Sequence, residues 1–214
     1  MGAGGEPLGL RERKKLRTRA ALVDAALDLF TANGYDATTV EGIAAAVEVS
    51  PRTFFRYFDG KEDVALSTLA ELDQLMLAEL ERRPADEPPL TALRAAYRAL
   101  LAHLTGPDRA ALVRFLTVHH LVEATPALLA GSLRRQADVE RLVTAEIARR
   151  AGADRTDLRP RLLVRLVLAG VRVGFEAGCR RGVLDDPALL VATVEEALDL
   201  ATAGVPDRWG APWR

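Results

Sequence analysis

The chain has few of the residues that mark secreted or membrane-spanning proteins. Cys179 is its one cysteine among 214 residues, and a single thiol cannot form an internal disulfide. No apolar signal segment begins the sequence. The most apolar stretch, residues 162–178, is interrupted by Arg165, Arg172 and Glu176, and such charges are costly in lipid. These absences predict a protein of the reducing cytoplasm with no membrane partner.

Charge of either sign is not in excess, because 29 basic side chains face 30 acidic ones, for a formal net charge of −1. This balance excludes a uniformly basic protein that coats nucleic acid.

The residue sets of common enzymes are also missing. There is no Ser-His-Asp or Cys-His arrangement, no phosphate-binding glycine loop and no metal-ligand spacing. His119 and His120 are neighbours, so on a helix they point about 100° apart and do not form a metal-binding pair. His103 is isolated. We therefore expect no enzymatic activity, no metal and no other cofactor.

Apolar residues at helical spacing are abundant. Hydrophobic residues make up 49% of the chain although aromatics make up only 5%, which is enough apolar surface for a folded core. The alternation typical of strands is absent. The pattern predicts an all-α fold of about nine helices, which begin near residues 10, 38 or 39, and 51, and then cover about 61–83, 90–104, 108–122, 126–150, 157–181 and 187–203.

The first sixty residues have the layout of a helix-turn-helix, with three short helices and a tight turn over residues 48–50. Thr38 and Glu41 have the spacing of a capping box for the second helix. Ser50 followed by Pro51 is a typical start for the third.

The third helix, predicted over residues 51–58, has two different faces. Phe54 and Phe58 lie four positions apart and are predicted to be buried. An arginine in the major groove can bind guanine O6 and N7, and a phenyl ring can pack against a thymine methyl group. The residues predicted on the exposed face or at its edges are Arg52, Thr53, Phe55, Arg56 and Tyr57.

A basic run lies ahead of the apolar part of the first helix. Over residues 11–19, six Lys and Arg side chains oppose only Glu12, for a local charge of +5. We predict that this run, including Arg17, is a flexible arm that binds DNA phosphates or enters the minor groove. A merely solvated segment is the alternative.

A longer pattern joins these features. It consists of residues 18–30 (TRAALVDAALDLF), 33–35 (NGY), 38–40 (TTV), 43–44 (IA), 49–50 (VS), 53–58 (TFFRYF) and 61–62 (KE). The pattern resembles the DNA-binding domain of TetR-family bacterial transcriptional regulators. Arg52 stands where that family usually has a small residue, and Phe55 where it usually has tyrosine. The resemblance implies DNA contacts by Thr39, Gly42, Pro51, Arg52, Thr53, Phe55, Tyr57 and Lys61.

Residues 1–9 are rich in glycine, contain a proline and have no periodic apolar pattern, so we expect a disordered lead-in there. The resemblance implies a helix-turn-helix DNA-binding domain over 10–62 and a helical effector-binding and dimerisation domain over 63–214.

Small residues between 162 and 182 suggest how two chains associate. They let another helix approach closely, and with the apolar face of the last helix they predict a four-helix interface across a two-fold axis. A contact within one chain is the alternative. The small residues are Ala169, Gly170, Gly174, Ala177 and Gly178.

An effector pocket is predicted among the middle helices, lined by apolar residues and a few polar groups. For Met76 and Phe115, simple core packing is the alternative. Family resemblance implies a ligand such as an acyl thioester, a drug or a polyketide. The candidate lining residues are Met76, Tyr97, Leu100, Phe115, His119, His120 and Phe175.

These patterns together predict a homodimeric repressor that binds a palindromic double-stranded DNA operator. A small apolar or amphipathic effector would move the helix that begins at Lys61 and release the DNA. One alternative is a helical ligand-binding or enzymatic protein whose N-terminal helix-turn-helix no longer binds DNA. The other is a regulator that responds to a protein partner.

Overall fold

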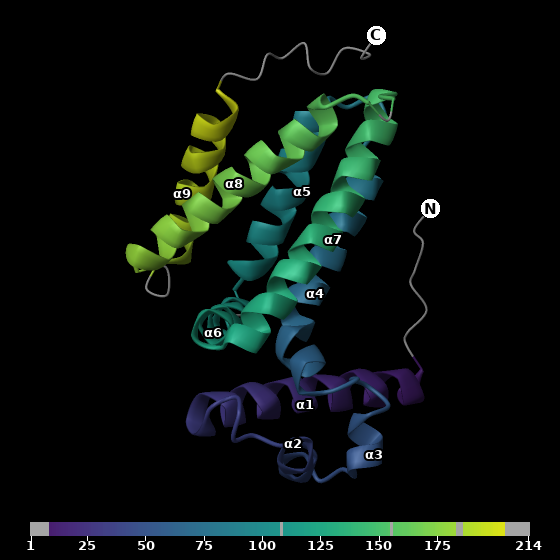
Figure 1. The fold of residues 1–214 in the computed structure, drawn as a ribbon, viewed down its shortest axis with the longest axis vertical. Coiled ribbons are helices and arrows are strands. Elements are labelled where there is room, and N and C mark those ends of the chain that lie inside the picture. The colour runs from purple at the N-terminus through teal and green to yellow at the C-terminus, as the bar shows by residue number, and fades with distance from the viewer. Residues whose placement is uncertain (1–8, 108, 155, 183–185, 204–214) are drawn as a thin grey trace. The chain divides into compact units, whose positions relative to one another are not determined.

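The computed structural model describes residues 9–107, 109–154, 156–182 and 186–203, drawn as a ribbon in Figure 1. In these ranges the chain forms nine helices and no strand, so the all-α prediction is confirmed. Residues 1–8 of the predicted disordered lead-in lie outside them. The helices are α1 (Leu10–Asn33), α2 (Val40–Ala46), α3 (Pro51–Phe54), α4 (Lys61–Arg82), α5 (Pro89–Leu104), α6 (Ala110–Ala124), α7 (Pro126–Ala151), α8 (Arg159–Arg180) and α9 (Pro187–Thr202).

The helices divide into two compact units. The first unit holds the chain up to Thr68 together with Thr117–Ser132, and the second holds Leu69–Leu116 and the chain from Leu133 onward. Helices α4, α6 and α7 therefore contribute residues to both units. Within the described ranges, no helix is long and apolar enough to cross a membrane.

The first unit is built on the apolar face of α1. Leu22, Ala26 and Phe30 are fully or almost fully buried, and they recur at the four-residue spacing of one helix face. Gly34 ends α1 with a φ of +84°, a conformation that favours glycine, and its N–H donates to the Phe30 carbonyl.

The N-terminus of α2 differs from the prediction. Thr39, not Thr38, is the N-cap, and its Oγ1 accepts a hydrogen bond of 3.0 Å from the Gly42 N–H. Thr38 is buried, and its hydroxyl lies within hydrogen-bonding distance of the Gly34 carbonyl, 2.9 Å, and of the Leu29 carbonyl, 3.2 Å. The predicted capping box of Thr38 and Glu41 is therefore wrong, because the Thr38 hydroxyl bonds back to the chain around the end of α1.

The second unit has one apolar core, formed by the second half of α4 with α5, α7, α8, α9 and the first part of α6. Of the three glycines that α8 turns toward α9, Gly174 is the most crowded, since an added Cβ would lie 2.7 Å from the Thr193 carbonyl oxygen. Gly170 and Gly178 face the same helix, near Leu198 and Leu190. These three glycines were predicted at an interface between two chains. They instead pack against a helix of the same chain, which was the alternative prediction.

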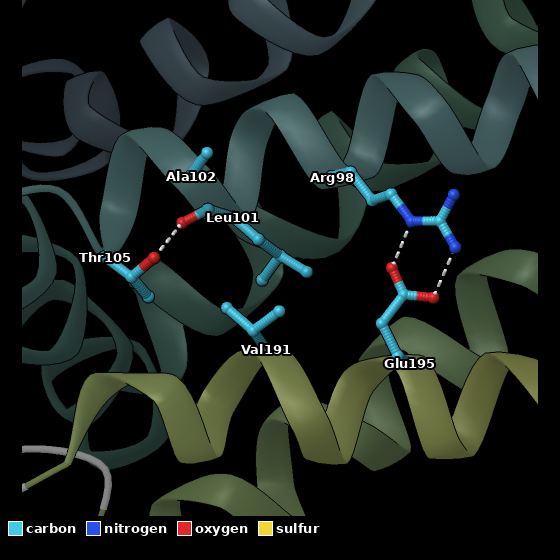
Figure 2. Close-up of a pocket in the computed structure, with 6 residues that line it drawn as sticks. All are labelled: Arg98, Leu101, Ala102, Thr105, Val191 and Glu195. Carbon is cyan, nitrogen blue, oxygen red and sulfur yellow. Dashed lines mark hydrogen bonds and ion pairs between the residues drawn. The ribbon is translucent and has the colours of Figure 1, made fainter.

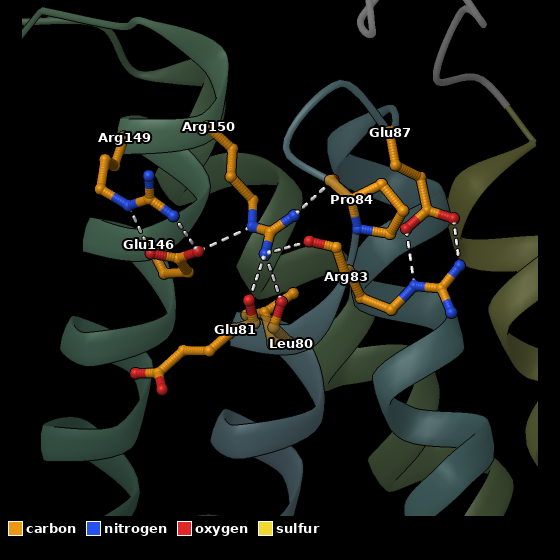
Figure 3. A network of polar contacts seen from close by, with 8 residues as sticks. All are labelled: Leu80, Glu81, Arg83, Pro84, Glu87, Glu146, Arg149 and Arg150. Carbon is orange, nitrogen blue, oxygen red and sulfur yellow. Dashed lines mark hydrogen bonds and ion pairs between the residues drawn. The ribbon is translucent and has the colours of Figure 1, made fainter. Parts of the chain in front are cut away.

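A buried arginine joins the ends of α7 and α4 within the second unit (Figure 3). The side chain of Arg150 is 1% exposed. Its guanidinium donates to the carbonyls of Leu80, Arg83 (3.1 Å) and Pro84 (2.9 Å) and to the Glu146 carboxylate (2.7 Å). The last carbonyls of a helix lack partners within it and attract positive charge, so Arg150 stabilises the end of α4.

Candidate DNA-binding surface and small-molecule groove

Helix α3 begins as its sequence predicts. Ser50 is the N-cap, and its Oγ accepts a hydrogen bond of 3.2 Å from the Thr53 N–H, while Pro51 occupies the first turn. The helix is shorter than predicted, because only Pro51–Phe54 is regular α-helix. Residues 55–57 continue as a turn, which the Phe58 N–H closes onto the Phe54 carbonyl at 3.1 Å.

The two faces of α3 and its following turn are as predicted. Phe54 and Phe58 are 0% and 2% exposed, with ring centroids 5.6 Å apart. Phe55 is 55% exposed, and Arg52 is exposed beside it. Because the buried rings anchor the segment, Arg52 and Phe55 are presented to solvent from a fixed backbone.

Two further residues that were predicted to contact DNA, Arg56 and Tyr57, contact each other. The Arg56 guanidinium carbon lies 5.1 Å from the centroid of the Tyr57 ring, and its Nη2 is 3.4 Å from the Tyr57 hydroxyl. Thr39 and Gly42 are both exposed at the start of α2. Since the Thr39 hydroxyl accepts the capping bond, its own hydrogen stays available for a DNA phosphate.

Lys61 begins α4, and its ammonium already has partners. Its Nζ donates to the Tyr35 carbonyl at 2.7 Å and the Asp36 carbonyl at 3.3 Å, and it lies 4.4 Å from the centroid of the Tyr35 ring. Burial, followed by the charges of Glu62 and Asp36, raises the pKa of the Tyr35 phenol. Lys61 thus ties the start of α4 to the loop before α2, and its predicted phosphate contact stays a prediction.

The basic run is helical. Helix α1 begins at Leu10, so residues 11–19 belong to it, and the prediction of a flexible arm is wrong. The side chains of Arg13, Lys14 and Arg17 are exposed. An exposed ion pair of 3.7 Å joins Lys15 to Glu12, and such pairs contribute little to stability. The run therefore displays its positive charge from a helix.

The predicted effector-contacting residues divide between the units. Met76 and Tyr97 are buried in the core of the second unit, where the Phe115 and Phe175 rings also pack, with centroids 4.9 Å apart. Burial raises the pKa of the Tyr97 phenol far above its ordinary value. Leu100 is partly buried against the same core. The two remaining candidates, His119 and His120, lie in the first unit.

A groove of about 600 Å³ lies between α5 and α9 (Figure 2). Arg98 lies at one end of the groove, and its Nε and Nη2 donate to the Glu195 carboxylate at 2.6 and 3.0 Å. The hydrogen bonds from Arg98 and Arg94 lower the pKa of Glu195. Sequence reasoning missed this groove, although its size suits a small molecule. It is lined by Arg98, Leu101, Ala102, Thr105, Val191 and Glu195.

Metal ligands do not gather in the part of the chain that the structure describes. No group of three or more His, Cys, Asp or Glu side chains there could hold a metal ion.

Comparison with known proteins covers both units. Residues 22–68 match the family model described as bacterial regulatory proteins, tetR family, and residues 87–206 match the MftR C-terminal domain. The chain is 45% identical to the HTH-type transcriptional regulator TcmR of Streptomyces glaucescens, over 95% of this chain and 91% of that protein. The chain belongs to the TetR family of transcriptional regulators.

Other TetR-type proteins are similar along most of their length. The chain is 28% identical to the putative mycofactocin biosynthesis transcriptional regulator MftR of Mycobacterium tuberculosis, over 90% of this chain and 93% of that protein. The alignment with a solved structure of a SmeT–triclosan complex spans 92% of this chain and 96% of the SmeT chain, with a TM-score of 0.59 and 24% identity. NalD, a repressor of a multidrug efflux pump in Pseudomonas aeruginosa, covers 89% and 97%, with a TM-score of 0.55 and 21% identity. The structural likenesses show the fold.

TetR-family membership confirms the resemblance seen in the sequence and makes the protein a DNA-binding transcriptional regulator with a helix-turn-helix. Its curated relatives TcmR and MftR are regulators of transcription.

Proposed function

We propose that the protein is a homodimeric repressor, which binds a palindromic operator and leaves it when a small amphipathic molecule binds the second unit. The observation that carries the proposal is the anchoring of α3, where buried Phe54 and Phe58 present exposed Arg52 and Phe55. A groove-reading segment needs such a fixed backbone, because base contacts depend on the position of each donor.

The basic side chains of α1 supply the part of the affinity that does not depend on sequence. Each Lys or Arg that neutralises a phosphate releases counterions, so binding weakens as salt rises. Arg17 and its basic neighbours are exposed. The chain carries a net charge of −1, which limits non-specific affinity and leaves discrimination to α3.

A dimer is required because a palindrome has two half-sites about one helical turn apart. We assign the interface to the sides of α8 and α9 that their mutual packing leaves free. Leu162, Ala169 and Val173 share one side of α8 and are exposed, as is Leu200 on α9. Exposed apolar side chains that share a helix face are typical of interfaces.

The effector is proposed to be apolar with one polar group. The second unit offers an aromatic pair, Phe115 and Phe175, and the groove between α5 and α9, where an ion pair adjoins apolar Leu101 and Val191. A solved structure of this fold is a complex with triclosan, in keeping with a small-molecule effector of this class.

The test is selection of bound duplexes from random DNA, followed by a screen for small molecules that release the selected duplex. We expect a palindrome, two protomers per duplex and an affinity that falls steeply with salt. Arg52→Ala should weaken binding, whereas Arg141→Ala, which removes an exposed arginine of α7, should not. Absence of salt-dependent DNA affinity would favour a helical ligand-binding or enzymatic protein instead.

A further inference from the structure

The first turns of α7 belong to the same compact unit as the DNA-reading helices, since residues 117–132 group with the chain up to Thr68. Gly131 is buried there against α4. A Cβ added at Gly131 would lie 2.9 Å from Leu66 Cδ1 and closer still to Glu62 Oε1. Real side chains do not approach so closely, so a side chain at residue 131 would require the ends of the Glu62 and Leu66 side chains to shift.

The part of α4 that Gly131 touches is tied to the helix-turn-helix on both sides. Lys61 donates from its ammonium to the carbonyls of Tyr35 and Asp36, in the loop before α2. The Asp63 carboxylate accepts a hydrogen bond of 2.9 Å from the Asp59 N–H, in the turn after α3. The first turn of α4 is therefore bonded both to the loop before α2 and to the turn after α3.

Glu62 lies between these two sets of contacts. Its carboxylate faces Gly131 of α7, and its charge also contributes, after burial, to the raised pKa of the Tyr35 phenol. Glu62 thus lies near both α7 and the Tyr35 ring, and it directly follows Lys61, which bonds to the loop before α2.

We propose that Gly131 is a positioning residue for DNA reading, because its missing side chain lets α7 hold the first two turns of α4 in register with α2 and α3. The inference rests on the proposed DNA-binding function and adds to it a contact between α7 and the first turns of α4. Helices α6 and α7 both continue into the second unit, so they give an effector there a covalent route to this contact.

The experiment is a double-mutant cycle on the full-length protein and the duplex selected by the wild type. Gly131→Ala should lower affinity at least tenfold, because the new methyl group displaces Glu62 and presses on buried Leu66. Glu62→Ala alone should stay within about threefold of the wild type, and it should restore most of the loss in the double variant. Gly106→Ala is the control, since a Cβ there makes ordinary contacts of 3.5 Å.

Hydrogen exchange without DNA separates positioning from unfolding. In Gly131→Ala the Asp59 amide, which donates to Asp63 in the wild type, should exchange faster, while the amides of α8 keep their protection. Affinity of Gly131→Ala equal to that of the wild type, or a double variant with no rescue, overturns the inference alone. A wild type that binds no duplex overturns the proposed function and this inference with it.

Discussion

Arg150→Met tests whether one buried guanidinium holds the end of α4. Methionine keeps the apolar stem but leaves the carbonyls of Leu80, Arg83 and Pro84 without this donor. Breaking a buried, hydrogen-bonded charge interaction on one side costs about 3–5 kcal/mol. For a chain of this size 1 kcal/mol shifts the melting temperature by about 2–4 °C, so we expect a decrease of roughly 6–20 °C.

Arg149→Met is the matched control. Arg149, the residue before Arg150 on α7, donates to the same Glu146 carboxylate, but its side chain is 65% exposed. Its loss should leave the melting temperature at the wild-type value. Thermal unfolding by circular dichroism measures both variants at one fixed protein concentration, since the proposed dimerisation would make melting concentration-dependent. Equal shifts for the two variants, or a shift below about 2 °C for Arg150→Met, would refute the reasoning.

Three further predictions follow from the same contacts. Phe54→Ala should destabilise the first unit by about 3–5 kcal/mol, as measured by chemical denaturation, because it removes a buried ring. Phe55→Ala removes an exposed ring, so it should lower DNA affinity in a duplex titration with little change in the free energy of unfolding. Val173→Asp should shift the protein from dimer to monomer in analytical ultracentrifugation, because Val173 is an exposed apolar side chain on the proposed interface. The pKa of Glu195 is lowered in the folded state, mainly by its hydrogen bond from Arg98. Its stabilising contribution is therefore present above its ordinary pKa and lost as pH falls through the lowered folded value, so Glu195→Gln should flatten the acid side of the stability profile measured by melting.

Local signals in the sequence predicted the anchoring of α3. Phe54 and Phe58 are four positions apart, and Ser50 precedes Pro51, so burial and capping follow from helical spacing and from the chemistry of single residues. Thr38 and Thr39 show where this reasoning ends. Both carry a hydroxyl, and the choice of cap depends on the carbonyls that the end of α1 places beside Thr38.

Contacts between distant segments were not predictable in the same way. The small residues of α8 indicated a close helix neighbour, but spacing alone does not say whether that helix belongs to the same chain. The groove depends on Arg98 meeting Glu195, which lies 97 positions later. Arginines at 94 and 98 and acids at 195 and 199 have matching four-residue spacings, and these spacings are a sequence signal that could have paired α5 with α9.

The central claim is that an anchored α3 reads a specific operator. The most direct measurement is the DNA affinity of the wild type and of Arg52→Ala. It is taken on the selected duplex and on its single-base-pair variants, at several salt concentrations. We predict that Arg52→Ala loses about 1–3 kcal/mol on the selected duplex, a five- to 150-fold weakening, and discriminates less at one base pair. Its salt dependence should stay close to that of the wild type. Wild-type affinity that is equal for all duplexes, or an equal loss on every sequence in Arg52→Ala, would contradict the account.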